Sequence, residues 1–171
     1  MVTELKGQPC AVCGENKSIL REDEVDIPHF GKVYVLTLEC EACGYKKSDL
    51  ESAEEKEPCR FTFEIESDAD LNVKVVKSGE ATLKIPHIIT VEPGVASDGY
   101  ITNIEGLLEK VKKMIESSVD AEEDDDAVKK SKNLIKKLNR ALAGQEKLKI
   151  IIEDPTGHSA IISDRAVKNK L

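Results

Sequence analysis

Four of the five cysteines stand in two short motifs that could hold a metal ion. Cys10 and Cys13 lie in PCAVCG, and Cys40 and Cys43 lie in ECEACGY. A glycine follows each motif, and glycine permits the turn in which backbone amides face the thiolates. Two such turns can arrange four soft sulfur ligands around one tetrahedral ion, for which zinc is favoured. Because four ligands close the coordination shell, we predict one structural Zn²⁺ rather than a catalytic one.

The wide separation of the two motifs predicts a long hairpin between them. More residues lie between Cys13 and Cys40 than in most paired CxxC sites. We expect the chain to run out along Ser18–Glu24 and to return along Gly31–Glu39, which together form a zinc ribbon. A redox-active CxxC is the alternative, but a redox pair does not explain a second matching motif. Cys59 has no partner and is interpreted as an ordinary small residue.

The overall charge excludes some classes of partner. The chain has 171 residues and a net charge of -8, and an acidic chain is a poor general binder of nucleic acid.

The N-terminal residues lack the pattern of a secretory signal, and no apolar run is long enough to span a membrane. We therefore expect a cytoplasmic protein in a reducing compartment, where cysteines bind metals more often than they form disulfides.

Downstream of the cysteines the sequence predicts a body of short strands. Residues 46–59 are polar and are interpreted as a linker between the ribbon and this body. Arg60–Glu66 then alternates apolar and polar residues, as a half-buried strand does. Turn residues separate further predicted strands at Val73–Lys77, Ala81–Ile85 and Ile88–Glu92. Many short strands at close spacing are typical of an all-β sandwich or barrel.

A helical pattern interrupts these strands. Thr102 and Glu105 have the spacing of a capping box, and apolar residues then recur at helical intervals. A second helix is predicted over Ala127–Leu142, with Gly144 placed to end it. We therefore expect a helical hairpin inserted at residues 102–143.

Charge is divided within this hairpin. Residues 102–126 carry nine acidic and three basic side chains, including an acidic tip at 120–126, whereas residues 127–143 carry six basic and no acidic side chains. The favoured interpretation is that two antiparallel helices of opposite charge attract each other. The alternative is an exposed arm that binds a partner.

After the hairpin the strand pattern returns. Leu148–Asp154 is apolar, and the D-P-T-G turn leads to another short strand over residues 159–163. We divide the chain into a ribbon with its linker at 1–58, a β body at 59–163 that carries the hairpin, and a loose tail at 164–171.

We expect no enzymatic activity. The chain lacks a glycine-rich phosphate loop, an HExxH motif and a GxSxG motif. His29, His87 and His158 are far apart in sequence, and each is interpreted as a surface or capping residue. Asp68, Asp70 and Asn72, in SDADLN, could bind a cation, but without a second cluster of ligands they are interpreted as turn residues whose side chains bond to the backbone.

Several longer motifs resemble one family. They are IPHF…CEACGY, DLNVKVVKSGEATLKIP, GYITNIEGLL and IIIEDPTGHSAI, and together they resemble the ZPR-type zinc finger domain family over roughly Gln8–Ser163. The resemblance implies a mainly β fold in which a four-cysteine zinc ribbon is joined to a double-stranded β-helix body, jelly-roll-like, with an α-helical hairpin. Eukaryotic members carry this module twice, and this chain is similar to the single-module archaeal form.

The resemblance also implies a function. Family members bind translation elongation factor 1-alpha, and eukaryotic members act as a chaperone that helps this GTPase to fold. The four cysteines fall on the family's zinc ligands. Two signature segments, which include Leu71, Val75 and Val76, supply our candidate partner-binding residues: Asp70, Asn72, Lys77, Ser78, Asp154 and Gly157. His87 and His158 stand where an acid and an asparagine are expected.

Two other functions remain open. A nucleic-acid-binding zinc ribbon of transcription or translation is the first, although residues 1–59 carry seven basic and thirteen acidic side chains. An enzyme with a cupin-like metal pocket in the β body is the second, although the histidines are few and badly spaced for it.

Overall fold

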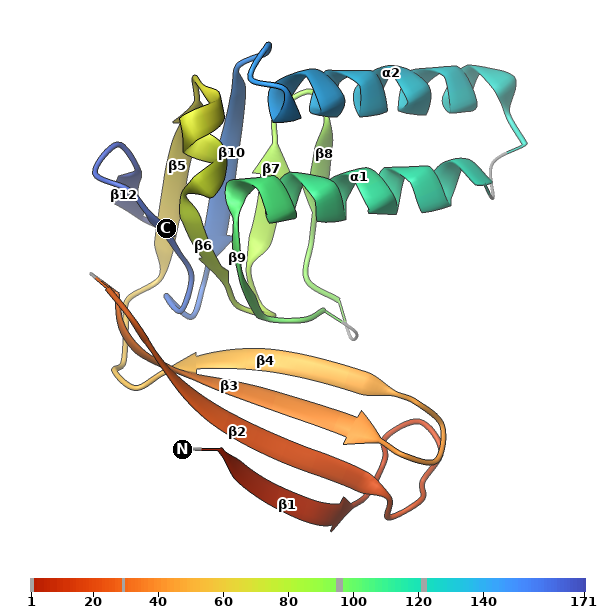
Figure 1. Cartoon of the computed structure of the whole chain (residues 1–171), viewed down its shortest axis with the longest axis vertical. Coiled ribbons are helices and arrows are strands. Elements are labelled where there is room, and N and C mark those ends of the chain that lie inside the picture. The colour runs from red at the N-terminus through yellow and green to blue at the C-terminus, as the bar shows by residue number, and fades with distance from the viewer. Residues whose placement is uncertain (1, 29, 95–96, 121–122) are drawn as a thin grey trace.

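The computed structural model describes residues 2–28, 30–94, 97–120 and 123–171. Figure 1 shows an N-terminal sheet, a second group of strands stacked against it, and a pair of helices that extends to one side. No helix in the described part of the chain is long and apolar enough to cross a membrane. The expected combination of a mainly β fold with a helical hairpin is confirmed.

The N-terminal sheet is a four-stranded antiparallel meander. Its strands follow chain order and are β1 (Thr3–Gln8), β2 (Ser18–Ile27), β3 (Gly31–Cys40) and β4 (Lys46–Ser52). Strands β2 and β3 form the long hairpin predicted between the cysteine motifs, paired from Ser18 opposite Cys40 to Ile27 opposite Gly31.

Strand β4 corrects the expectation of a linker over residues 46–59. Lys46–Ser52 pairs with β3 along its whole length and buries Leu50. The segment has a single large apolar residue, so its sequence shows no alternation. Residues 46–52 form a strand because every backbone amide needs a partner, and β3 supplies those partners. The burial of Leu50 adds one apolar contact.

The C-terminal body is a jelly-roll of two sheets. One sheet has the order β12-β5-β10-β7-β8, and the other has the order β11-β6-β9. The strands are β5 (Cys59–Ile65), β6 (Lys74–Lys77), β7 (Thr82–Ile85), β8 (Ile89–Val91), β9 (Tyr100–Asn103), β10 (Leu148–Asp154), β11 (Ala160–Ile162) and β12 (Val167–Lys170), and the short helix η1 spans Asp68–Asn72. The alternating residues of β5 place Phe61, Phe63 and Ile65 in the core, as predicted.

Strand β12 corrects the expectation of a loose tail over residues 164–171. Val167–Lys170 pairs with β5 and becomes the outer strand of the five-stranded sheet. All four of its residues are exposed, so no apolar pattern in the sequence marks it. The unpaired edge of β5 supplies the hydrogen bonds that fix this segment.

The inserted hairpin consists of α1 (Ile104–Asp120) and α2 (Asp125–Leu142). The capping box predicted from Thr102 is wrong, because Thr102 pairs with Val75 in the sheet and the helix begins only at Ile104. Asn103 acts as the cap instead, and its Oδ1 accepts a hydrogen bond of 2.8 Å from the Gly106 amide. Gly144 has φ of +69° and follows the C-cap residue Ala143, so it ends α2 as expected.

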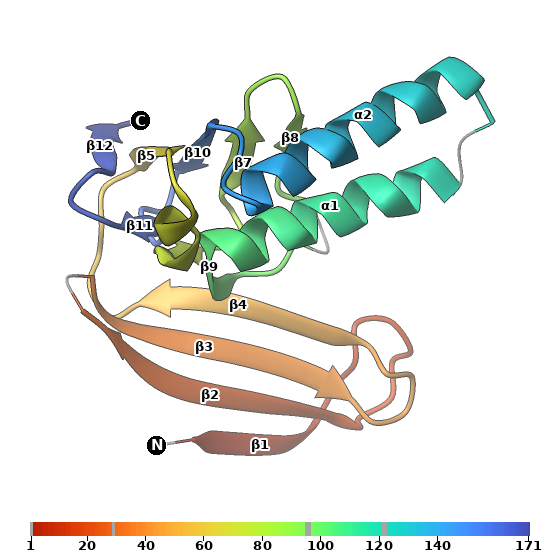
Figure 2. The same cartoon turned by 45° about the horizontal axis from the view of Figure 1, so that its top comes forward.

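Apolar contacts hold the hairpin to the body. The buried residues of α1 and α2 join the jelly-roll core, and they are Ile104, Leu107, Leu108, Val111, Ile115, Leu138 and Ala141. Figure 2 shows the distal halves of both helices extending beyond the strands. No ion pair joins α1 to α2 among the described residues, and the α2 bases Lys137 and Arg140 pair with Glu146 instead. The predicted attraction between the two helices therefore does not involve ion pairs between their described residues.

The ribbon packs against the jelly-roll, in addition to being joined to it by the chain. Ile27, Val33 and Leu50 of the ribbon form a buried cluster with Val76 of β6. Polar contacts surround this cluster, and the Asp49 carboxylate accepts a hydrogen bond of 3.2 Å from the Gly79 amide. The two parts of the chain thus share an apolar interface.

Candidate metal centre

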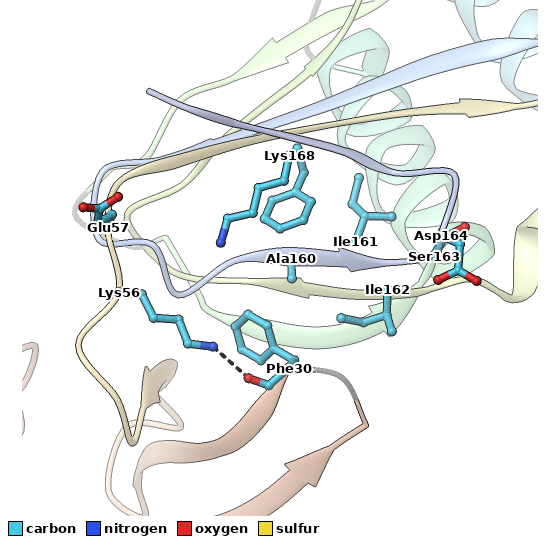
Figure 3. A pocket seen from close by; sticks show the side chains of 10 residues that line it. Phe30, Lys56, Glu57, Ala160, Ile161, Ile162, Ser163, Asp164 and Lys168 are labelled. Carbon is cyan, nitrogen blue, oxygen red and sulfur yellow. Dashed lines mark hydrogen bonds between the residues drawn. The ribbon is translucent and has the colours of Figure 1, made fainter.

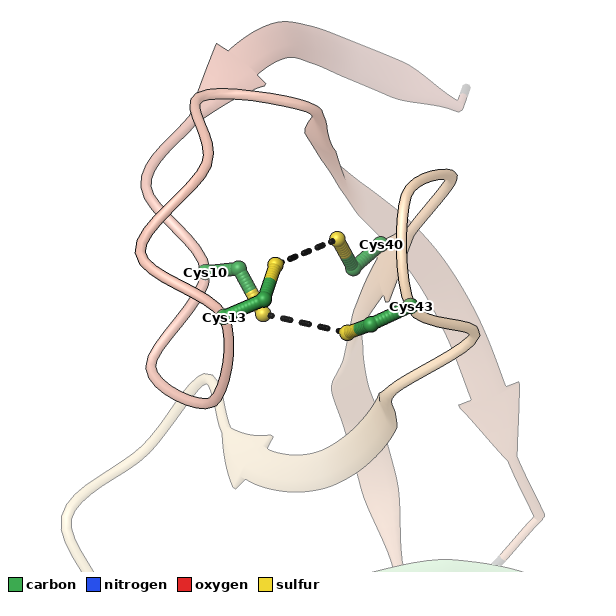
Figure 4. A group of neighbouring side chains, drawn as sticks. All are labelled: Cys10, Cys13, Cys40 and Cys43. Carbon is green, nitrogen blue, oxygen red and sulfur yellow. Dashed lines mark hydrogen bonds between the residues drawn. The ribbon is translucent and has the colours of Figure 1, made fainter.

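The two CxxC motifs meet at one end of the ribbon. The four sulfur atoms of Cys10, Cys13, Cys40 and Cys43 all lie within 4.8 Å of one another. Figure 4 shows them converging from two facing loops, with distances of 3.7 Å from Cys10 Sγ to Cys43 Sγ and from Cys13 Sγ to Cys40 Sγ. A tetrahedral zinc ion with Zn–S bonds of about 2.3 Å requires sulfur atoms about 3.8 Å apart. The sulfur positions therefore fit zinc.

Each motif is a tight turn closed by its glycine. The Gly14 amide donates to the Cys10 carbonyl at 3.0 Å, and the Gly44 amide donates to the Cys40 carbonyl at 2.9 Å. Both glycines have a positive φ, +73° and +74°, which other residues adopt only with strain. Strand β3 ends at Cys40, so the β2–β3 hairpin brings the second turn to the first.

In each turn, backbone amides favour the thiolate form of the first cysteine. The amide of Cys43 lowers the pKa of the Cys40 thiol to about 6. The amide of Cys13 likewise lowers the pKa of the Cys10 thiol. Since zinc binds thiolates, this local hydrogen bonding prepares the first cysteine of each motif for the metal.

Cys59 does not belong to the metal centre. It lies in β5 within the jelly-roll core, and only 1% of its surface is exposed. Its thiol donates to the Ser159 carbonyl at 3.7 Å, and burial raises the pKa of this thiol. Cys59 is thus a small buried residue, as interpreted from the sequence.

The histidines do not build a second metal site with the other potential ligands. Within the described ranges, the four cysteines are the only group of three or more His, Cys, Asp or Glu side chains that could share an ion. His87 is exposed in the turn between β7 and β8 with φ of +63°, and His158 is half-buried beside Gly157. His29 lies outside the described residues.

A buried carboxylate organises the predicted signature segments. Asp154 Oδ2 accepts hydrogen bonds from the Ser78 hydroxyl at 2.8 Å and the Ser159 hydroxyl at 2.5 Å. Its Oδ1 accepts from the amide and hydroxyl of Thr156 at 2.8 and 2.7 Å. Burial by itself raises the pKa of Asp154, but these donors outweigh burial and hold the pKa below its usual value. Asp154 therefore ties the D-P-T-G turn to the end of β6.

Gly157 allows this turn to approach the connection between ribbon and body. Its φ is +73°, and a Cβ built on it would lie 2.4 Å from the Glu57 carbonyl oxygen. Another residue here would be strained in its backbone and would also clash. Gly157 thus has a packing role.

The candidate partner-binding residues fall into two places. Lys77, Ser78, Asp154 and Gly157 lie together, and the Lys77 ammonium donates to the Ser78 carbonyl at 3.0 Å. Lys77 is 5% exposed, and burial lowers its pKa.

Asp70 and Asn72 lie elsewhere, on η1. The Asp70 carboxylate accepts from the amides of Glu66 and Ser67, which is the turn bonding predicted from SDADLN. It also binds Arg165, a residue that the sequence had assigned to a tail. Of the six candidates Asn72 alone is exposed, so for the other five the structure shows internal bonding, and their contact with a partner remains a prediction.

Sequence reasoning missed Thr156, Ser159 and Arg165. The first two follow Asp154 at short spacing, and a serine or threonine hydroxyl two to five residues from an acid is a usable signal for such a turn. Arg165 gave no local signal, because its partner Asp70 is 95 residues away.

Comparisons with known proteins agree with this architecture. The ZPR1 zinc-finger domain matches residues 2–58, and the ZPR1 jelly-roll domain matches residues 69–170. An uncharacterized ZPR1-like protein of Methanocaldococcus jannaschii is 34% identical over 157 residues, which cover 91% of this chain and 79% of that protein.

Two further relatives extend the comparison. Another uncharacterized ZPR1-like protein, from Pyrococcus horikoshii, is 34% identical and covers 99% of this chain and 78% of its own length. The zinc finger chaperone zpr1 of Schizosaccharomyces pombe is 33% identical over 89% of this chain, which spans 33% of that longer protein. With a four-thiolate zinc centre joined to a jelly-roll body, and with these matches along nearly its whole length, the chain belongs to the ZPR1 family and holds one structural Zn²⁺.

Proposed function

We propose that this chain binds translation elongation factor 1-alpha in the cytoplasm and assists its folding or handling as a chaperone without enzymatic activity. The observation that carries the proposal is the match of the ribbon and of the jelly-roll body to two ZPR1 domains. A relative from Schizosaccharomyces pombe bears the name zinc finger chaperone. The link to the elongation factor comes from the resemblance of the sequence motifs to the ZPR-type family.

The metal centre supports a binding role. Four thiolates complete the coordination of zinc, so no position is left for a substrate or a reactive water. The zinc instead fixes the loops at the end of the ribbon into a rigid surface. A protein without covalent chemistry can act on a client only through different affinities for the client's conformations.

The helical hairpin supplies a second surface for the client. Its distal half extends beyond the strands, as Figure 2 shows, and several bases of α2 form no ion pair within the described part of the chain. These bases are Lys129, Lys130, Lys132 and Lys136. The basic face of α2 and the acidic ribbon offer a client two contacts of opposite charge. Such an arrangement favours one orientation of a bound client.

Calorimetry with the elongation factor from the same organism tests the proposal. The full-length zinc-loaded protein is titrated into the factor without nucleotide, with GDP and with GTP. We expect saturable one-to-one binding that changes with the nucleotide, and faster or more complete recovery of the factor during refolding. Absence of binding to every form, native or refolding, would overturn the proposal. Retention on RNA at moderate salt, in place of that binding, would favour the nucleic-acid alternative.

A further inference from the structure

A cavity of about 700 Å³ opens where the ribbon meets the jelly-roll. It is lined by Phe30 of the ribbon, by Lys56 of the connection, by Phe61 of β5 and Lys168 of β12, and by β11 with the residues that follow it. Figure 3 shows β11 crossing the middle of this cavity, with Lys168 on one side and Phe30 and Lys56 on the other. A cavity of this size is large enough for a ligand of several residues or a small molecule.

Two ammonium groups face this cavity without carboxylate partners. Lys56 Nζ donates to the Phe30 carbonyl at 2.8 Å and lies 3.3 Å from the centre of the Phe30 ring. Lys168 Nζ lies 5.7 Å from the centre of the Phe61 ring. Neither lysine forms an ion pair within the ranges that the structure describes. An ammonium group has three donors, so both groups keep hydrogen-bonding capacity for a ligand.

Three carboxylates lie near the two ammonium groups or line the cavity, those of Glu54, Glu57 and Asp164. Glu57, next to Lys56 in sequence, pairs with Lys170 at 2.7 Å. Figure 3 places Asp164 at the other end of the cavity, beyond Ser163. Burial lowers the pKa of Lys56 and the charge of Lys168 lowers it further, whereas the charge of Glu54 opposes this shift. At this end of the cavity the three lysines Lys56, Lys168 and Lys170 outnumber the two carboxylates of Glu54 and Glu57.

Apolar side chains and the end of an outer strand form much of the remaining lining. Phe30, Phe61 and Ile162 provide apolar walls beside the two lysines. Among the described residues, strand β11 is the outer strand of its sheet and pairs with β6. Ala160 and Ile161 are buried, whereas Ile162 and Ser163 are half-buried, so the end of this outer strand is the part that an extended segment of another chain can contact.

We propose that this cavity binds an extended acidic segment of a partner protein, which contacts the half-buried end of β11 at Ile162 and Ser163 and places a carboxylate against Lys56 and Lys168. Successive side chains of an extended segment point to opposite faces. The side chains that alternate with the carboxylate can therefore contact the apolar walls of the cavity. This site is separate from the zinc centre, and the inference does not require that the partner be the elongation factor.

Titration with a model peptide tests the inference. The probe is a blocked hexapeptide of alternating glutamate and valine, added to the ¹⁵N-labelled, zinc-loaded, full-length protein. We expect amide resonances of Phe30, Lys56 and residues 160–164 to shift in a saturable manner. The same peptide with glutamine in place of each glutamate should bind about tenfold more weakly or less, because it lacks the charge that the ammonium groups attract. Equal binding of the two peptides would overturn the inference, and this comparison needs no variant protein.

Variants of matched charge locate the site. Lys56→Gln combined with Lys168→Gln should reduce the affinity for the acidic peptide by about tenfold or more. Lys6→Gln combined with Lys147→Gln removes the same charge from exposed positions outside the cavity and should change the affinity by less than about twofold. Unaltered affinity in the cavity variant, or shifts confined to α2, would contradict the inference. A single-stranded RNA that shifts the same amides more strongly than the peptide would also contradict it.

Discussion

Asp70 and Arg165 are 95 residues apart in the chain, yet the guanidinium of Arg165 donates to the Asp70 carboxylate at 2.6 Å. The same guanidinium also donates to the Glu64 carbonyl at 2.9 Å. These bonds attach the segment before β12 to η1 and to the end of β5. The C-terminal residues are therefore part of the jelly-roll and contribute to its stability.

Arg165→Gln should lower the free energy of unfolding at pH 7 by about 1 kcal/mol, since the pair is partly exposed to solvent. Burial opposes ionisation of Asp70, but two backbone amides and Arg165 outweigh it and hold the pKa of Asp70 below 3.8. A carboxylate whose pKa is lowered by folding stabilises the folded protein at pH values above its usual pKa. This stabilisation is lost as the pH falls through the pKa of the folded state. The difference between the variant and the wild type should therefore shrink as the pH falls below the usual pKa of an aspartate and through the lowered pKa of Asp70.

Urea unfolding, followed by the helical circular dichroism signal at pH 7 and at lower pH, measures this difference. Lys170→Gln is the control, because its pair with Glu57 is more exposed and should contribute little. A variant as stable as the wild type at pH 7 would show that the segment before β12 is not held by Arg165.

Asp154→Asn should destabilise the body by about 2–4 kcal/mol, because asparagine has one acceptor oxygen and its NH₂ group would face either the Ser78 and Ser159 hydroxyls or the Thr156 donors. Because the pKa of Asp154 is lowered in the folded protein, its carboxylate stabilises the fold at pH values above the usual pKa of an aspartate. This stabilisation is lost as the pH falls through the folded pKa, so the destabilisation by Asp154→Asn should be largest near neutral pH. Denaturant unfolding at constant zinc concentration measures it. Glu64→Gln, at an exposed position, serves as the control, and equal stabilities of the two variants would contradict the role of Asp154.

Gly157→Ala and Gly14→Ala form a matched pair. Both glycines have φ of +73°, but a Cβ at Gly14 meets nothing within 4 Å, whereas one at Gly157 lies 2.4 Å from the Glu57 carbonyl oxygen. Gly14→Ala should cost about 1–2 kcal/mol from the backbone conformation alone. Gly157→Ala should cost at least about 2 kcal/mol more, because the turn must also move. Thermal unfolding of both zinc-loaded variants gives the comparison, and similar melting temperatures would refute the proposed close contact.

Cys40→Ser should abolish zinc binding and unfold the cysteine end of the ribbon while the helices of the body remain folded, because metal binding supplies folding energy to the ribbon. Zinc content by atomic emission and the helical circular dichroism signal measure the two effects. Cys59→Ser should retain one zinc per chain, since Cys59 lies in the jelly-roll core. Unchanged zinc content in Cys40→Ser would refute the ligand assignment.

The sequence by itself determined the features that depend on neighbouring residues. The CxxC-Gly turns, the alternating strand β5 and the periodic helices α1 and α2 follow from local pattern and spacing, because their conformation is set within a few residues. The pairing of the two cysteine motifs was also predictable, since four ligands of one kind require a common ion.

Tertiary structure decided the features that depend on distant partners. Strands β4 and β12 carry few apolar residues and became strands only because the edges of β3 and β5 offered backbone partners. The Asp70–Arg165 pair, the hydroxyl donors around Asp154 and the cavity beside β11 likewise join segments that no local pattern connects. Such contacts are set by chain topology, which brings together groups whose sequence separation leaves no periodic signal.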